Sequence, residues 1–167
     1  MSLTDIPLVD TDTHVSEPPD LWTSRLKADY GDLVPRVVVD GDGRERWKVA
    51  DRLLEGSGKW AAAGWHEFPP SSPKTLAEAD PGSWDPAKRL ERMDEYGIDV
   101  QVLFPNILAF YMQMFIAMDE PEFLKDAIRA YNDFLTDFAS ENEKRLVPLM
   151  VLPYWDIEAS VEEIRRA

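Results

Sequence analysis

Residues 6–18 decide the fold, and they read Ile6-Pro7-Leu8-Val9-Asp10-Thr11-Asp12-Thr13-His14-Val15-Ser16-Glu17-Pro18. The apolar residues at the start of this stretch predict a buried first strand. The strand then ends in side chains that bind metals or protons, namely Asp10, Asp12 and His14. Since successive side chains of a strand point to opposite faces, these three are expected on one face.

Two interpretations of this pattern are open. In the first, Asp12 and His14 bind one metal ion from the same side of the strand, because carboxylate oxygens and imidazole nitrogens suit zinc, manganese or iron. In the second, Asp10 or Asp12 caps a turn and His14 is a hydrogen-bonded histidine at a strand end. A two-ligand D-x-H pattern is short and common, so its spacing does not separate the two.

The stretch 9–18 resembles the first-strand motif of the amidohydrolase-related family. This is the branch of the amidohydrolase superfamily that includes aminocarboxymuconate-semialdehyde decarboxylase. Two later segments resemble the same family in the same order. They are residues 89–105, which read RLERMDEYGIDVQVLFP, and residues 145–153, which read RLVPLMVLP.

The resemblance implies an α/β fold, a TIM-type (β/α)8 barrel with a metal at the C-terminal ends of its strands. It implies that Asp12 and His14 are first-strand ligands of a divalent metal ion, with zinc favoured and manganese or iron as alternatives. The family's other ligands, histidines on middle strands and an aspartate on a late strand, have no counterpart here. A complete barrel needs about 250 residues. We therefore expect residues 1–167 to be the N-terminal portion of one metal-dependent barrel domain. This portion would hold about three β/α units, with a hairpin and loop inserted at about 30–83.

The resemblance also implies a metal-dependent hydrolase or decarboxylase that acts on a small carboxylated or cyclic substrate. In hydrolysis the metal polarises a substrate oxygen or lowers the pKa of a bound water. In decarboxylation it orients a carboxylated aromatic or unsaturated acid. Asp12 and His14 are ligands in both schemes, so they do not separate the two reactions. The alternative is a non-catalytic α/β interaction module that binds a protein through a Trp-rich insertion.

Charge and composition exclude several classes of protein. The chain carries 32 acidic and 18 basic residues, a formal net charge of −14, which repels phosphate backbones and anionic membranes. We therefore expect a small-molecule substrate and neither nucleic acid nor membrane as a partner. The chain has no cysteine, and the N-terminus lacks the basic and apolar regions of a signal peptide, which fits a cytoplasmic protein.

The insertion has two predicted parts. Two extended runs around Asp40-Gly41-Asp42-Gly43 predict a β-hairpin. Residues 50–83 are rich in Gly, Ser and Pro and predict an irregular segment at the metal end of the barrel. His66 lies in this segment and is interpreted as a solvent-facing or structural histidine. Glu17 is expected near the metal mouth, either in a functional role or as a turn carboxylate.

The remaining chain alternates helices and strands, which is typical of an α/β fold. Asp85-Pro86 is predicted to start a helix that buries Leu90, Met93 and Tyr96 or Gly97. The helix is expected to end at Gly97, before a strand over residues 98–104.

The apolar residues 107–118 are predicted to form buried packing or, alternatively, a pocket wall or dimer contact. The longest helix starts at residues 119–121, and its buried face is predicted to consist of Leu124, Ile128, Tyr131, Leu135 and Phe138. A third strand over 146–152 precedes a final helix that Asp156 caps and that carries Ile157, Val161 and Ile164.

If nothing follows Ala167, the chain is not expected to be an active monomer. Three strands cannot close a barrel, and the faces with Leu124, Ile128, Leu135, Leu149 and Val151 would lack neighbours. An unpaired sheet edge of this kind favours homo-oligomers. Sizing chromatography with light scattering measures this. A monodisperse, cooperatively melting monomer with bound metal would contradict the barrel interpretation.

Overall fold

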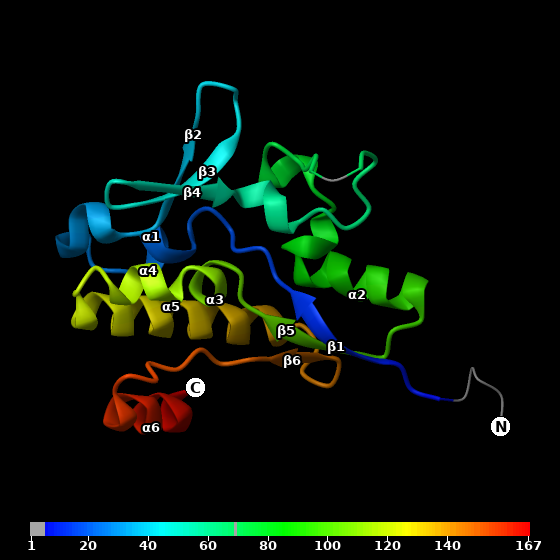
Figure 1. Cartoon of the computed structure of the whole chain (residues 1–167). Coiled ribbons are helices and arrows are strands. Elements are labelled where there is room, and N and C mark those ends of the chain that lie inside the picture. The colour runs from blue at the N-terminus through cyan, green and yellow to red at the C-terminus, as the bar shows by residue number, and fades with distance from the viewer. Residues whose placement is uncertain (1–5, 69) are drawn as a thin grey trace.

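The structure, a computed structural model, describes residues 6–68 and 70–167 and contains two sheets with helices around them (Figure 1). The strands are β1 Val9–His14, β2 Arg36–Val39, β3 Glu45–Val49, β4 Arg52–Gly56, β5 Val100–Phe104 and β6 Leu146–Pro148. The α-helices are α1 Leu21–Arg25, α2 Pro86–Tyr96, α3 Ile107–Phe110, α4 Met112–Ile116, α5 Pro121–Ala139 and α6 Ile157–Arg166. Short 3-10 turns cover Ala28–Leu33, Ser57–Trp60, Leu76–Glu78 and Pro81–Ser83.

The first sheet is parallel and has the order β1-β5-β6. Helix α2 lies between β1 and β5 in the chain, and α5 lies between β5 and β6. Parallel neighbours need such crossover connections, because the chain must return to the same end of the sheet. The mixed α/β class with a parallel sheet is thereby confirmed.

The prediction that the first strand is buried is wrong. Ile6, Leu8 and Val9 are 51%, 51% and 48% exposed. Within the described residues β1 pairs with β5 alone, so one side of the strand has no neighbour to cover these side chains. The β1–β5 register also shifts between Asp10 and Thr13, which marks a β-bulge or irregularity in the strand.

The second sheet is antiparallel and has the order β2-β3-β4. The predicted hairpin is present, and its turn places Gly43 at a φ of 75°, a conformation that favours glycine. Asp40 accepts hydrogen bonds from the backbone N–H groups of Arg44 and Asp42, and these bonds lower the pKa of its carboxyl. Strand β4 was expected to be irregular, but pairing with β3 makes residues 52–56 regular. Irregular segments and 3-10 turns fill most of residues 57–83.

Helix α2 has the predicted boundaries. The Asp85 side chain accepts from the backbone N–H of Lys88, and Gly97 ends the helix at a φ of 69°. Its buried face differs from the prediction. Met93 is buried, but Tyr96 is 68% exposed and Arg89 is buried instead. Arg89 is buried because polar groups at the end of β1 accept its hydrogen bonds.

The main core lies between α5 and the segments that pack on it. All five residues predicted for the buried face of α5 are at most 4% exposed, and they are Leu124, Ile128, Tyr131, Leu135 and Phe138. We expected Leu124, Ile128 and Leu135 to lack packing neighbours if nothing follows Ala167. In the structure, the side chains of all three are buried. Helices α1 and α4 pack on α5, and residues 107–118 contribute buried side chains, as the packing interpretation predicts. These are Ile107, Leu108, Met112 and Phe115.

The last part of the chain is less regular than predicted. Strand β6 ends at Pro148 rather than Leu152, although the backbone N–H of Leu149 still donates to Leu103 O. Asp156 caps α6 as predicted, through a bond from the backbone N–H of Ala159.

Helix α6 turns its polar side inward. Its apolar residues Ile157, Val161 and Ile164 are 67%, 40% and 56% exposed, while Ser160 and Glu163 are buried. Glu163 accepts from Asn132 of α5, which holds the polar side of α6 against the protein. None of the helices in the described residues is both long enough and apolar enough to cross a membrane.

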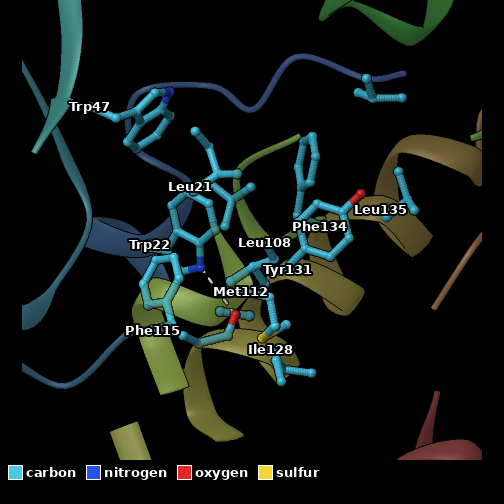
Figure 2. Close-up of a cluster of buried hydrophobic side chains, with 14 of the residues drawn as sticks. Leu21, Trp22, Trp47, Leu108, Met112, Phe115, Ile128, Tyr131, Phe134 and Leu135 are labelled. Carbon is cyan, nitrogen blue, oxygen red and sulfur yellow. Dashed lines mark hydrogen bonds between the residues drawn. The ribbon is translucent and has the colours of Figure 1, made fainter. Parts of the chain in front are cut away.

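Trp22 of α1 anchors the core, and we predict that its truncation is strongly destabilising. The indole is fully buried, donates to Ala127 O at 3.0 Å, and packs edge-on against Trp47 (Figure 2). Trp22→Ala should lower the free energy of unfolding by about 3–5 kcal/mol, because it leaves a cavity in the core and removes the indole's hydrogen bond to Ala127 O. Urea denaturation followed by circular dichroism measures this. Phe68→Ala, at a side chain that is 93% exposed, is the control and should change little. Equal effects of the two variants would contradict the assigned core.

Candidate metal centre

His14 ends β1, and its ring is held in one orientation. Its Nδ1 lies 2.9 Å from Pro105 O, just beyond β5. A carbonyl oxygen only accepts, so Nδ1 carries the proton in this bond. The other nitrogen, Nε2, keeps its lone pair and lies 3.9 Å from Asp12 Oδ1. This is how metal-binding histidines are commonly arranged, with one nitrogen on a carbonyl and the other available.

Asp10 does not share the face of Asp12 and His14, which corrects the expectation of three residues on one face. Its Oδ2 accepts from Gln101 Nε2 at 3.0 Å, and its Oδ1 accepts from the backbone N–H of Asp12 at 3.2 Å. The register shift between Asp10 and Thr13 breaks the strict alternation of side chains. Asp10 therefore has the turn-capping role of the second interpretation, while Asp12 lies beside His14.

Arg89 of α2 fixes the other side of the β1 end, and the sequence analysis did not single it out. It donates to Thr13 Oγ1, His14 O, Gln101 Oε1 and Ser83 O at 2.8–3.3 Å. Burial lowers the pKa of the guanidinium to about 10, against an opposing effect of the nearby carboxylates. The group remains charged at neutral pH and joins α2, β1 and β5.

Two aromatic rings contact the imidazole, and a third stacks on one of them. Phe110 stacks on His14 with ring centroids 5.6 Å apart, and Phe104 lies at 5.8 Å. Trp60 stacks on Phe110 at 4.6 Å and an angle of 8°. The 3-10 turn Ser57–Trp60 therefore lies at the same end of β1 as Asp12 and His14. Phe110, in the apolar run 107–118, thus faces the site, while most of that run is core.

A pocket of about 290 Å³ runs along β1 beside these residues. Residues of β1, of α2 and of the insertion line it, among them Asp12, His14, Trp60, Arg89 and Arg92. Within the described part of the chain, Trp60 Nε1 is buried and has no hydrogen-bond partner. Such a donor is costly to leave unpaired, so it is a candidate for contact with a ligand or an ordered water.

Glu17 is not an exposed turn carboxylate. It is 2% exposed, and its Oε1 accepts from the backbone N–H groups of Asn106 and Ile107, both at 2.9 Å. Burial raises the pKa of this carboxyl, while the two backbone bonds act in the opposite direction. No local pattern around Glu17 indicates this role, because the donors come from a segment about 90 residues further along the chain.

His66 lies outside this arrangement. Its side chain is 72% exposed, 3.9 Å from Glu67 Oε1, and its ring packs on Trp65. It does not line the pocket beside His14. The interpretation of His66 as a solvent-facing residue is therefore confirmed.

Asp12 and His14 fit a metal ion as a pair of donors. Two donors at typical bond lengths of about 2.0–2.2 Å from a tetrahedral ion lie about 3.3–3.6 Å apart. His14 Nε2 and Asp12 Oδ1 are 3.9 Å apart, and the Asp12 side chain is 82% exposed and can rotate to close the difference. Within residues 6–68 and 70–167, no group of three or more His, Cys, Asp or Glu side chains is placed to hold a metal. The described residues therefore bring together one pair of candidate donors, fewer than the four of a tetrahedral site.

Comparisons with known proteins agree with the sequence resemblance. No family model matches the chain. A curated relative, 2-amino-3-carboxymuconate-6-semialdehyde decarboxylase of Dictyostelium discoideum, is 32% identical over 95 residues. The match covers 56% of this chain and 24% of the relative. The chain thus spans about a quarter of the length of the curated relative that it matches.

Solved structures match nearly the whole chain. An amidohydrolase from Mycobacterium avium subsp. paratuberculosis superposes with a TM-score of 0.72 at 18% identity, over 97% of this chain and 47% of that protein. A 2,6-dihydroxybenzoate decarboxylase from Rhizobium matches with a TM-score of 0.46 at 20% identity, over 96% of this chain and 34% of that one. The first match shows that the fold is that of part of an amidohydrolase. The chain is therefore similar in sequence to part of a 2-amino-3-carboxymuconate-6-semialdehyde decarboxylase and shares the fold of about half of an amidohydrolase.

Proposed function

We propose that residues 1–167 form the N-terminal portion of a metal-dependent (β/α)8 barrel enzyme. They would contribute about the first three β/α units, with the segment at about 30–83 as an insertion. The order of parallel strands and crossover helices supports this, as does the 0.72 TM-score to about half of an amidohydrolase. Barrel enzymes of this type keep their active sites at the C-terminal ends of the strands, and Asp12 and His14 lie at that end of β1.

Asp12 and His14 would hold one divalent ion, with zinc favoured and manganese or iron as alternatives. The observation that carries this assignment is the pair of contacts of the His14 ring. Pro105 O accepts a hydrogen bond from Nδ1–H, which in the neutral ring leaves the lone pair on Nε2, 3.9 Å from a carboxylate oxygen of Asp12. When bound, such an ion supplies Lewis-acid polarisation of a substrate oxygen or an acidified water.

The residues around Asp12 and His14 orient the His14 ring and provide an aromatic surface beside it. Pro105 O and Phe110 fix the ring of His14, so little rotational freedom is lost when Nε2 is used. Phe110 stacks on both His14 and Trp60, so aromatic rings cover one side of the imidazole. Aromatic rings of this kind suit contact with a planar, unsaturated or cyclic substrate.

We propose a hydrolase or carboxy-lyase that acts on a small carboxylated or cyclic substrate. The curated relative is named as a decarboxylase, which favours the carboxy-lyase of the two. The net charge of −14 argues against nucleic acid or an anionic membrane as a partner, and the open edge of β1 is compatible with a homo-oligomer. The alternative is an interaction module that binds a partner through the Trp-rich segment; of its tryptophans, Trp47 is buried in the core, Trp60 stacks on Phe110 and Trp65 packs on the exposed His66.

The test is the metal content of the full-length protein. Wild type should hold one divalent transition metal per chain after purification. His14→Ala should lower the occupancy at least about tenfold, because it removes a direct ligand. Elemental analysis by mass spectrometry measures the ratio.

His66→Ala is the matched control, since it removes the other histidine of the chain at an exposed position. It should leave the occupancy unchanged. Unchanged stoichiometric metal in His14→Ala would eliminate the ligand assignment, and loss of metal in both variants would point to a general effect of histidine removal.

A further inference from the structure

We infer that Glu17 is a positioning residue for His14, acting through the turn that follows β5. Nothing in the proposed metal chemistry uses Glu17 directly. The inference concerns the orientation and tautomer of the imidazole, and it rests on the proposed function only for its catalytic consequence.

The first step is the bond between His14 Nδ1 and Pro105 O. This bond selects the tautomer with the proton on Nδ1 and leaves Nε2 as an acceptor or ligand. The position of one carbonyl oxygen therefore decides which nitrogen of His14 is available.

The second step is what holds that carbonyl. Proline has no N–H, so Pro105 cannot anchor its own peptide by donating a bond. The next two residues do so, because the backbone N–H groups of Asn106 and Ile107 both donate to Glu17 Oε1 at 2.9 Å. The peptide that contains the Pro105 carbonyl also contains the Asn106 nitrogen, so Glu17 grips the very peptide unit that bonds His14.

The third step is that Glu17 acts from the same chain segment as His14. The backbone N–H of Val15 donates to Phe104 O, and the Asn106 side-chain amide donates to Val15 O. Val15, His14 and Glu17 thus each bond the segment 104–107 beyond the sheet. A shift of the Pro105 carbonyl away from His14 would break the bonds to Glu17.

A purely packing role accounts poorly for this residue. Burying a carboxyl group costs free energy that an apolar side chain of the same size would not incur. Without the Glu17 carboxyl, the backbone N–H groups of Asn106 and Ile107 would remain buried but would lose their acceptor, which destabilises the fold. The carboxyl therefore serves to fix the backbone at this point.

The test uses the full-length protein labelled with ¹⁵N-histidine, without metal and at a pH at which the imidazole is neutral. Spectra of His14→Gln and His66→Gln identify the signals of the two histidines of residues 1–167, and the exposed His66 serves as an internal reference. Long-range ¹H–¹⁵N correlation spectra report which ring nitrogen carries the proton. Wild-type His14 should be mainly the Nδ1–H tautomer.

Glu17→Met keeps the volume but removes the acceptor. It should change the ratio of the two His14 tautomers by up to about tenfold toward Nε2–H, the effect of losing one net hydrogen bond. Glu17→Gln keeps a weaker, neutral acceptor and should produce a smaller change in the same direction, about two- to threefold. The His66 signals should stay as in wild type.

Asn132→Leu is the matched control for general destabilisation. Asn132 is also buried and also anchors the backbone after a strand, through bonds with Val151 N and Val151 O. It should lower stability and leave the His14 tautomers unchanged. An unchanged ratio in Glu17→Met, or an equal change in Asn132→Leu, would overturn the inference.

If Glu17→Met does not fold, Glu17→Gln decides, and a wild-type tautomer ratio in that variant overturns the inference. Since no metal is present in these spectra, a failure here is separate from a failure of the metal assignment.

Discussion

The structure depends on how the ends of β1 and β5 are joined beyond the parallel sheet. The ladder hydrogen bonds between β1 and β5 stop at His14 and Phe104, yet the segments that follow the two strands continue side by side for several residues. A buried carboxyl from Glu17 replaces the ladder there by accepting two backbone N–H groups. Since buried N–H groups need partners, this acceptor allows the chain to leave the sheet and enter α3 without an unpaired donor.

His14 is held at two points by two buried ionisable side chains. Arg89 donates to its backbone carbonyl at 2.8 Å, while Glu17 holds the turn that binds its ring. Burial shifts the pKa of each group toward its neutral form, up for Glu17 and down for Arg89. Burying such groups costs free energy, and here they hold the residue whose ring orientation matters for the proposed site.

Local patterns in the sequence predicted the elements that local interactions form. Asp85 and Gly97 bound α2 because capping needs only a few neighbouring residues, and α5 follows its apolar period. Several features that these patterns did not predict depend on distant contacts. Glu17 is buried by donors far along the chain, and α6 turns Glu163 rather than Ile157 toward the protein because Glu163 bonds Asn132. The spacing of apolar residues predicts which side chains share one face of a helix, but it does not predict which face packs against the rest of the protein.

The candidate site shows why a structural and a functional interpretation of one motif need not exclude each other. Asp10 takes the turn-capping role, and His14 Nδ1 makes the structural hydrogen bond. Because Asp10 and His14 Nδ1 make these structural bonds, Asp12 and His14 Nε2 remain available for a ligand. His14 Nε2 and Asp12 Oδ1 are 3.9 Å apart. The irregularity in β1 makes this division necessary, because it separates Asp10 from the face that Asp12 and His14 share. A regular strand would instead place three polar groups in a row, and the turn cap and the pair of donors would compete for the same carboxylates.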